Sequence, residues 1–359
     1  MIGIGRQSQV VGVDIGSYAI KVAELRRKNK GGVDRFSVKK LGYEILPRDA
    51  IVEGTIMDSA TVAETIGMIF EENKISTKNV IISVSGNSVI IKKISLQAME
   101  KEELAESIFW EAKHSLPYPQ EEVNIDYTIL PFSSESERKN YDVLLVAAKK
   151  DKISNYSNAV HQANRNPVAV EVDVFALLNA AEINYAEIFR DKTIAIINLG
   201  AGLTSVIISE KGIPQLFRDL PLGGSQLTEN LSKELNIGFD DAEKILKGLP
   251  IEEGLVEQSR AALNLYIQNL LEEIYKTLSF YETGEGKGRT IDLILLCGGL
   301  SKITDLADRF EEKFDIQSNV LDPFRQIDID RKRFDPLYFD ELAAQLGVAI
   351  GLASRKPEK

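Results

Sequence analysis

Two stretches of the chain alternate apolar and polar residues around a turn that contains glycine. The first reads VVGVDIGSYAIKVAEL at 10–25, and the second reads TIAIINLGAGLTSVIIS at 193–209. Alternation with a period of two predicts β-strands, and the glycine between the two halves predicts a hairpin. The stretches align residue by residue, and the matched pairs are Asp14 with Asn198, Gly16 with Gly200, Ser17 with Ala201 and Val22 with Val206. This repeat predicts two related lobes, each presenting one turn to a shared cleft.

A third stretch completes the pattern. Residues 291–310, IDLILLCGGLSKITDLADRF, predict a buried strand, a turn at Gly298 and Gly299, and then a helix. Such an arrangement places bare backbone and a helix N-terminus against a ligand. Together, the three turns indicate a phosphate-binding cleft, whereas any one glycine alone is explained equally well by an ordinary tight turn.

The remaining periodicity divides the chain further. Apolar residues at helical spacing predict a helix from Asp58 or Ser59 to Asn73, followed by a short strand at 80–84. Between 87 and 165, the order strand, helix, strand, strand, helix indicates a separate unit inserted into the first lobe. Helices are then expected at 173–184, 225–235, 240–246, 252–281 and 339–354.

Composition narrows the class of protein. A net charge of −11 and the lack of a basic stripe argue against nucleic-acid binding and against attachment to an anionic membrane by charge. Cys297 is the only cysteine, so no intrachain disulfide can form, and its place at the end of an apolar strand predicts a buried structural thiol. No apolar run approaches the ~20 residues of a membrane-spanning helix, so we expect any membrane attachment to pass through a partner.

These patterns resemble the actin-like ATPase superfamily, and within it the PilM family of type IV pilus assembly proteins. The resemblance covers nearly the whole chain, and its motifs are GVDIGSYAIKVAEL at 12–25, ILPRDAIVEGTIMD at 45–58, VIISVSGNSVIIKKISLQAMEKEEL at 80–104, EAKHSLPYPQEEVNIDY at 111–127, LPLGGSQLT at 220–228 and LCGGLSKI at 296–303. It implies an α/β fold, the actin-like (ribonuclease H-like) two-lobed ATPase fold, with an FtsA-type 1C subdomain insertion. The implied division is lobe 1 (subdomain 1A) at 1–86, 166–190 and 338–359, subdomain 1C at 87–165, lobe 2 (subdomain 2A) at 191–224 and 291–337, and subdomain 2B at 225–290.

The resemblance implies that ATP and Mg²⁺ are bound in the cleft. Asp14 ends the first strand, where a metal ion bridged to phosphate needs a hard oxygen ligand, and it is the expected metal ligand. The residues expected to contact the nucleotide are Asp14, Gly16, Ser17, Tyr18, Lys21, Asn198, Gly200, Ala201, Gly202, Thr204, Gly223, Gly224, Glu243, Lys247, Gly298, Gly299 and Ser301. The lysine that accompanies Glu243 is open between Lys244 and Lys247, because an i,i+4 charge pattern on an exposed helix explains the same residues.

Hydrolysis is expected to be slow. Asn198 replaces a carboxylate by an amide in the second hairpin, which removes a unit charge from the sphere that orders metal and water. A catalytic base or water-orienting group would then have to come from Glu171 or Asp173, in the segment before the second hairpin. Asp173 is equally suited to be a helix N-cap.

Three functions are compatible with the sequence to different degrees. The PilM resemblance implies an ATP-binding cytoplasmic adaptor that holds the N-terminal cytoplasmic tail of the inner-membrane protein PilN and links it to the pilus motor complex. The tail would lie between the first lobe and the inserted unit, with residues 84–94 and the helix near Trp110 as candidate walls, and self-association is also compatible. An FtsA-like cell-division filament protein is the alternative, although the expected linker and amphipathic membrane-binding helix are not seen after SRKPEK at 354–359. A small-molecule kinase is disfavoured by Asn198 and by the inserted unit.

Overall fold

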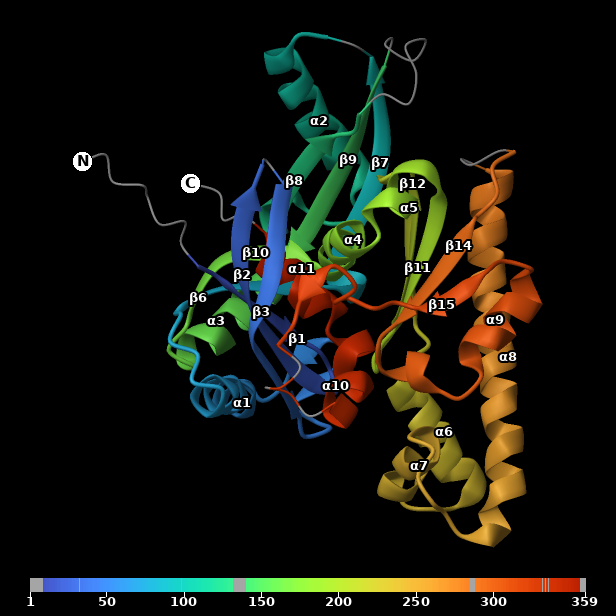
Figure 1. The fold of residues 1–359 in the computed structure, drawn as a ribbon. Helices are drawn as coiled ribbons and strands as arrows, with labels where there is room; N and C mark the ends of the chain where they lie inside the picture. The colour runs from blue at the N-terminus through green and yellow to red at the C-terminus, as the bar shows by residue number, and fades with distance from the viewer. Residues whose placement is uncertain are drawn as a thin grey trace.

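The computed structural model describes residues 9–31, 33–97, 99–131, 140–284, 288–330, 332, 334 and 336–355. Its core is formed by two sheets that share the same arrangement over five strands (Figure 1). The first sheet has the order β10-β6-β1-β2-β3-β16 and the second β13-β12-β11-β14-β15. Their strands are β1 (Val11–Ile15), β2 (Ala19–Lys30), β3 (Val33–Ile45), β6 (Asn79–Val84), β10 (Asn166–Val172), β16 (Ile327–Asp328), β11 (Thr193–Leu199), β12 (Thr204–Glu210), β13 (Ile213–Leu220), β14 (Leu293–Cys297) and β15 (Ser318–Val320).

The repeat predicted from the two hairpins extends over five strands of each sheet. In each sheet the opening hairpin gains a third antiparallel strand on one side, and two later strands join in parallel on the other. The opening strand of the first sheet is fully buried and that of the second is buried except at Asn198, and their residues are apolar on both faces apart from Asp14, Thr193 and Asn198. The predicted pair of related lobes is confirmed.

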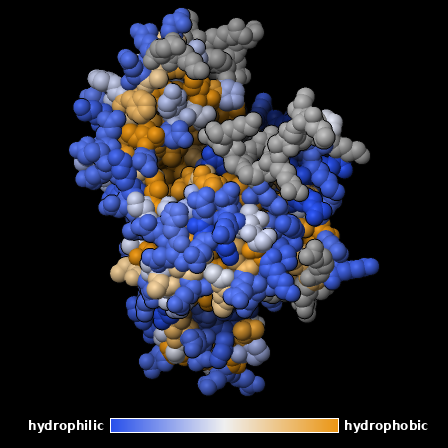
Figure 2. Space-filling model, turned by 90° about the vertical axis from the view of Figure 1, so that its left-hand side faces the viewer, coloured by the Kyte–Doolittle hydropathy of each residue, from blue (hydrophilic) through white to orange (hydrophobic). Residues whose placement is uncertain are grey.

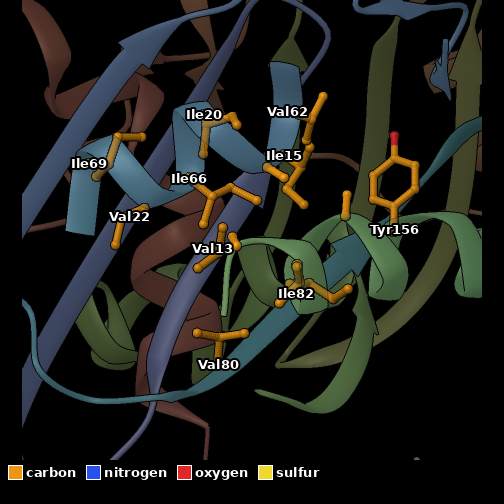
Figure 3. Packing of buried hydrophobic residues seen from close by; sticks show 14 of the residues in the cluster. Val13, Ile15, Ile20, Val22, Val62, Ile66, Ile69, Val80, Ile82 and Tyr156 are labelled. Carbon is orange, nitrogen blue, oxygen red and sulfur yellow. The ribbon is translucent and has the colours of Figure 1, made fainter. Parts of the chain in front are cut away.

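Helices cover both sheets. On the first sheet, α1 (Ser59–Glu72) and α3 (Lys150–Gln162) pack on one face, where Val13, Ile66 and Ile82 meet Tyr156 (Figure 3). On the second sheet, α8 (Val256–Thr283) and α9 (Leu306–Phe314) pack on the outer face. Below the sheet, α6 (Gly224–Leu235) packs against α7 (Phe239–Leu246) and the lower part of α8 (Figure 1). The space between the two sheets is filled by α4 (Asp173–Asn184), α5 (Ala186–Asp191) and α11 (Gly347–Ser354).

A three-stranded sheet stands apart at the top of the molecule in Figure 1. It has the order β7-β9-β8, from β7 (Val89–Gln97), β8 (Val123–Ile129) and β9 (Asn140–Lys149), and α2 (Lys101–Ser115) packs on it. We expected α3 to close this unit, but α3 packs against α1 and the first sheet instead. We therefore propose that the inserted unit ends near Lys149, and the other domain boundaries stay predictions.

Two expected helices differ from the structure. The helix expected at 339–354 is broken into α10 (Pro336–Leu342), a 3₁₀ turn at Ala343–Gln345 and α11. The carbonyl of Ala344 accepts a hydrogen bond from the Gly298 N–H at 2.9 Å, a bond between distant segments that local periodicity cannot reveal. The Gly298–Gly299 turn leads into a 3₁₀ turn at Gly299–Lys302, and α9 begins only at Leu306, so no α-helix N-terminus directly follows the glycines. A short hairpin is formed by β4 (Ile51–Val52) and β5 (Thr55–Ile56). None of the described helices is long and apolar enough to cross a membrane.

Candidate functional site

At the first turn, Asp14 forms an ion pair with Lys21. Asp14 and Lys21 are register partners in the β1–β2 hairpin, and Lys21 Nζ lies 3.2 Å from Asp14 Oδ2. The Gly16 N–H donates to the Ala19 carbonyl at 3.2 Å, which closes the turn. Lys21 Nζ lies only 2.8 Å from the place where a Cβ on Gly16 would be, so a side chain there would displace the lysine. The turn therefore presents a carboxylate and an ammonium group together.

Asp14 is costly to bury in its charged form. Burial raises its pKa to about 6; Lys21 opposes this rise, and the charge of Asp173 adds to it. A buried carboxylate with one cationic neighbour would be further stabilised by a second positive charge. The electrostatics therefore suit a cation next to Asp14.

The second turn is fixed by the start of α6. The Gly224 N–H donates to the Gly200 carbonyl at 3.0 Å, and the Ser225 N–H donates to the Ala201 carbonyl at 2.9 Å. Thr204 is fully buried, and its hydroxyl donates to the Leu222 carbonyl at 2.7 Å. The predicted Gly223–Gly224 pair thus anchors the second turn, and the Thr204 hydroxyl serves this anchor.

The first two turns lie against one another. Ser17 Oγ lies 3.1 Å from the place where a Cβ on Gly202 would be. This contact joins the hairpin of the first sheet to that of the second, as expected from their equivalence. The lobes are therefore close enough for one phosphate chain to touch both turns.

The third turn packs against the end of β11. Gly298 has φ of +84°, a conformation that favours glycine, and a Cβ there would lie 2.7 Å from Asn198 Oδ1. The buried Ser301 hydroxyl donates to the Gly298 carbonyl at 2.7 Å, so it stabilises the turn from within. Gly299 follows at the start of the 3₁₀ turn. The structure therefore brings Asn198 and the third turn together, and their contact with a nucleotide stays a prediction.

Side chains of α7 and of Lys247 at its C-terminal end lie close to the first turn. Lys247 Nζ donates to Glu243 Oε2 at 2.9 Å, and the Tyr18 hydroxyl donates to the same oxygen at 3.5 Å. Lys244 instead pairs with Asp241. Of the two lysines that the sequence left open, Lys247 is therefore the one that joins Glu243 and Tyr18.

The two candidate catalytic carboxylates have different surroundings. Glu171 forms an ion pair with Arg355, at 2.6 Å between Oε2 and Nη1. Asp173 is the first residue of α4, whose N-cap is Val172, so the N-cap interpretation of Asp173 is wrong. The charge of Asp173 contributes to the raised pKa of Asp14, so Asp173 lies within electrostatic reach of the first turn.

Sequence reasoning missed two charged groups near Asp173. Asp219 on β13 accepts a hydrogen bond from Ser205 Oγ at 2.7 Å, and burial raises its pKa, with Asp173 contributing. Lys152 on α3 donates to the Gly54 carbonyl and, at 3.2 Å, to the Tyr156 hydroxyl, and burial lowers its pKa. The sequence does show Asp219 as a charged residue in β13 just before Leu220, but its neighbours come from other segments.

Cys297 is predicted to be unreactive in the native protein. It is 1% exposed, and burial raises the pKa of its thiol to about 12. Because the thiolate is the reactive form, we expect no reaction with a disulfide reagent at pH 8 in buffer and one equivalent of reaction in denaturant. Rapid labelling of the native protein would contradict the buried position of this strand end.

Known proteins share this architecture. A family model described as type IV pilus assembly protein PilM matches residues 12–357. A chain of a PilM–PilN type IV pilus biogenesis complex superimposes with a TM-score of 0.86 at 25% identity, covering 99% of this chain and 100% of that one. An MreB of Spiroplasma citri bound to ADP superimposes with a TM-score of 0.50 at 14% identity, over 96% of this chain and 95% of that one, which shows the fold alone.

A curated relative is more distant. Cell division protein FtsA of Bacillus subtilis (strain 168) is 22% identical over 263 residues, which are 67% of this chain. The match spans 57% of the length of that FtsA. Because the family model covers nearly the whole chain, the protein belongs to the PilM family of type IV pilus assembly proteins and has the actin-like fold.

Proposed function

We propose that this protein is a nucleotide-dependent adaptor of type IV pilus assembly. In this proposal it binds Mg-ATP between its lobes and holds the N-terminal cytoplasmic tail of PilN, and it links PilN to the motor complex from the cytoplasmic side of the inner membrane. The observation that carries the proposal is the match to a chain of a PilM–PilN complex over 99% of this protein.

The nucleotide part of the proposal is supported by the cleft. The turns that carry Ser17 and Gly202 are in contact across the cleft, and Tyr18 and Glu243 meet beside them. A protein of the same fold, the MreB of Spiroplasma citri, has been solved bound to ADP. We therefore place the phosphates between the first two turns and the base near Glu243 and Lys247.

Magnesium fits Asp14 as a ligand that is shared with the nucleotide. Among the described residues, no group of three or more His, Cys, Asp or Glu side chains is arranged to hold a metal ion. Mg²⁺ is commonly held by one or two carboxylates together with substrate phosphates and water. Asp14 supplies one carboxylate and Ser17 a hydroxyl, so the ion would arrive with ATP and neutralise the buried charge.

Slow turnover is compatible with an adaptor. Asn198 offers an amide where a carboxylate would order water, and its Oδ1 lies against Cys297 Sγ at 3.8 Å. Asp173 is the remaining candidate for orienting water, whereas Glu171 is held by Arg355. We propose that the bound nucleotide serves mainly to set the arrangement of the lobes.

The peptide part of the proposal concerns the face between the inserted unit and the first sheet. Figure 2 shows apolar side chains gathered in the upper part of that face and bordered by hydrophilic ones. Large apolar side chains are exposed on the neighbouring elements, and they are Phe109 and Trp110 on α2, Ile129 on β8 and Val168 on the edge strand β10. An extended apolar tail could bury these side chains, because exposed apolar groups of this kind mark interaction sites.

Trp110 provides the test of peptide docking. It is the only tryptophan in the chain and is 63% exposed on α2. Titration with a synthetic peptide of the PilN cytoplasmic N-terminus is expected to shift Trp110 emission to shorter wavelength, because the indole loses contact with water. Trp110→Phe should abolish this signal and keep binding measurable by calorimetry. Peptide that fails to bind by either method would contradict the adaptor role.

The alternative is an FtsA-like filament protein. It is supported by the similarity to FtsA of Bacillus subtilis, although that match covers 67% of this chain against 99% for the PilM chain. ATP-dependent polymers in a sedimentation assay, without binding of the PilN peptide, would favour this alternative.

A further inference from the structure

One face of α7 lies against the first lobe. Phe239, Glu243 and Lys247 follow one another at intervals of four residues, so they share one face of this helix and its C-terminal end. The Tyr18 hydroxyl donates to Glu243 Oε2 at 3.5 Å, and Lys247 Nζ lies 5.6 Å from the centre of the Tyr18 ring. The remaining residue of this face, Phe239, is contacted by Arg48 of the first lobe. The face therefore meets two side chains of the opposite lobe.

Arg48 stands in a turn whose backbone is fixed beside the first turn. The Ala50 N–H donates to the Pro47 carbonyl at 3.0 Å, which closes the turn around Arg48. The Leu46 N–H donates to the Tyr18 carbonyl at 2.9 Å, and both Leu46 and Ala50 are buried in the core of the first sheet. The backbone of Arg48 is therefore held in place, while its side chain reaches the helices of the second lobe.

The guanidinium group of Arg48 stacks on the Phe239 ring. Its central carbon lies 3.2 Å from the centre of the ring, and its Nη2 lies 3.8 Å from Glu229 Oε1 on α6. The side chains of Arg48 and Glu229 are 55% and 50% exposed, so the ion pair contributes little by itself. The cation over the face of the aromatic ring is the stronger contact. We call the contacts of Arg48 with Phe239 and Glu229 the Arg48 clasp.

The clasp lies beside the proposed base site without belonging to it. We place the base near Glu243 and Lys247, which follow Phe239 on the same face of α7. The partners of Arg48 in the clasp are not among the residues that we assign to the nucleotide. The clasp therefore favours contact between the lobes equally with and without nucleotide. A base that lies where Tyr18 and Glu243 meet can enter or leave only when this face of α7 moves away from the first lobe.

We propose that Arg48 is a positioning residue that sets the rate of nucleotide exchange by holding α7 against the first lobe. The inference rests on the proposed function and adds a kinetic property to it: the clasp slows entry and release of Mg-ATP by the same factor and leaves the affinity unchanged. Opening of this kind limits ligand release in many proteins. Slow exchange suits an adaptor, because the bound nucleotide then keeps the lobes in one arrangement.

The expected size of the effect follows from the strength of the stack. Loss of an arginine from the face of an aromatic ring at a partly exposed site should accelerate both steps of exchange by about three- to tenfold. Because entry and release change by one factor, the dissociation constant should stay within about twofold of that of the parent. A residue that binds the nucleotide directly would instead change mainly the rate of release.

Stopped-flow fluorescence with ribose-labelled Mg-ATP measures both steps in the full chain. Entry is followed at increasing nucleotide concentration, and release is followed after excess unlabelled Mg-ATP is added. Arg48→Ala and Phe239→Leu should each accelerate both steps by the same factor, since either substitution removes the stack. The double variant should be no faster than the single ones, because the two residues make one contact. Arg48→Lys keeps the charge without the planar guanidinium, so its rates should lie between those of the parent and Arg48→Ala.

Arg165→Ala is the matched control. The Arg165 guanidinium also lies over an aromatic ring, 4.3 Å from the centre of Phe70. Phe70 on α1 and Arg165, which precedes β10, both belong to the first lobe. The substitution removes the same charge and the same kind of contact, so it should leave both rates of exchange unchanged.

Three results would overturn the inference. They are parent-like exchange in both Arg48→Ala and Phe239→Leu, acceleration factors that multiply in the double variant, and faster release from Arg48→Ala with unchanged entry. In the last case Arg48 would hold the nucleotide itself. Failure of the parent protein to bind Mg-ATP would instead overturn the proposed function, so the two failures are distinct.

Discussion

Replacing Asp14 with asparagine is expected to weaken Mg-ATP binding strongly and to stabilise the nucleotide-free protein. Loss of a group that only supports a metal ligand already costs about 10- to 100-fold in affinity, so loss of the ligand carboxylate should cost about 100-fold or more. The nucleotide-free protein is affected in the opposite sense, because burial raises the pKa of Asp14 from 3.8 to about 6.

The sign of the stability effect follows from that shift. A carboxyl group with a raised pKa in the folded state favours folding below its unfolded pKa, and this contribution is lost as pH rises through about 6. At pH 7 the penalty is at most about 3 kcal/mol, from a shift of roughly two pKa units. Asparagine carries no charge and removes this penalty. Lys21 then lacks a negative partner, which offsets part of the gain in stability. The stability difference between the variant and the parent should therefore grow between pH 4 and pH 7.

Calorimetry with Mg-ATP and thermal unfolding at pH 4 to 8 measure the two effects. Asp58→Asn is a suitable control, because Asp58 caps α1 at an exposed position and asparagine caps helices almost equally well. The control should keep nucleotide affinity and lack the pH-dependent gain. An Asp14→Asn protein that bound Mg-ATP like its parent would remove Asp14 from the metal site.

Gly351→Ala is expected to destabilise the protein severely. Gly351 on α11 faces α4 between the lobes, and a Cβ there would lie 1.8 Å from the Ala176 carbonyl oxygen. Because this neighbour is backbone within a helix, the helices must separate, and overpacking of this kind costs about 1–3 kcal/mol or more. Since α11 also packs closely on β1, the shift should disturb the strand that carries Asp14.

Gly67→Ala provides the opposite result. Gly67 lies within α1, and nothing would come within 4 Å of its added Cβ. Replacing a helical glycine in open space by alanine should stabilise by about 0.5–1 kcal/mol. Thermal unfolding should therefore rank Gly67→Ala above the parent and Gly351→Ala well below it. Equal melting temperatures for the two variants would contradict the close packing of α4 and α11.

Local patterns predicted the parts of the fold that depend on local physics. The two hairpins carry period-two alternation and a glycine turn, so their strands and equivalence were readable from 10–25 and 193–209. The α1 helix was equally clear, because Asp58 accepts from the Thr61 N–H as an N-cap should. The first two turns also meet across the cleft as their equivalence implies.

The misses involve contacts between distant segments. The break in the expected helix at 339–354 coincides with the hydrogen bond from Gly298 to Ala344. The placement of α3 depends on its apolar face meeting α1, which the order of elements alone does not decide. Asp219 was overlooked because its partner Ser205 lies on the neighbouring strand of the hairpin, 14 residues away in the sequence.

Calorimetry of the purified protein with Mg-ATP and with the PilN N-terminal peptide, separately and then together, tests the central claim most directly. We expect both to bind to one protein and ATP turnover to stay near background. ATP binding without peptide binding would leave the cleft as described and contradict the adaptor role. A failure to bind Mg-ATP would contradict the assignment of Asp14 and the three turns to a nucleotide.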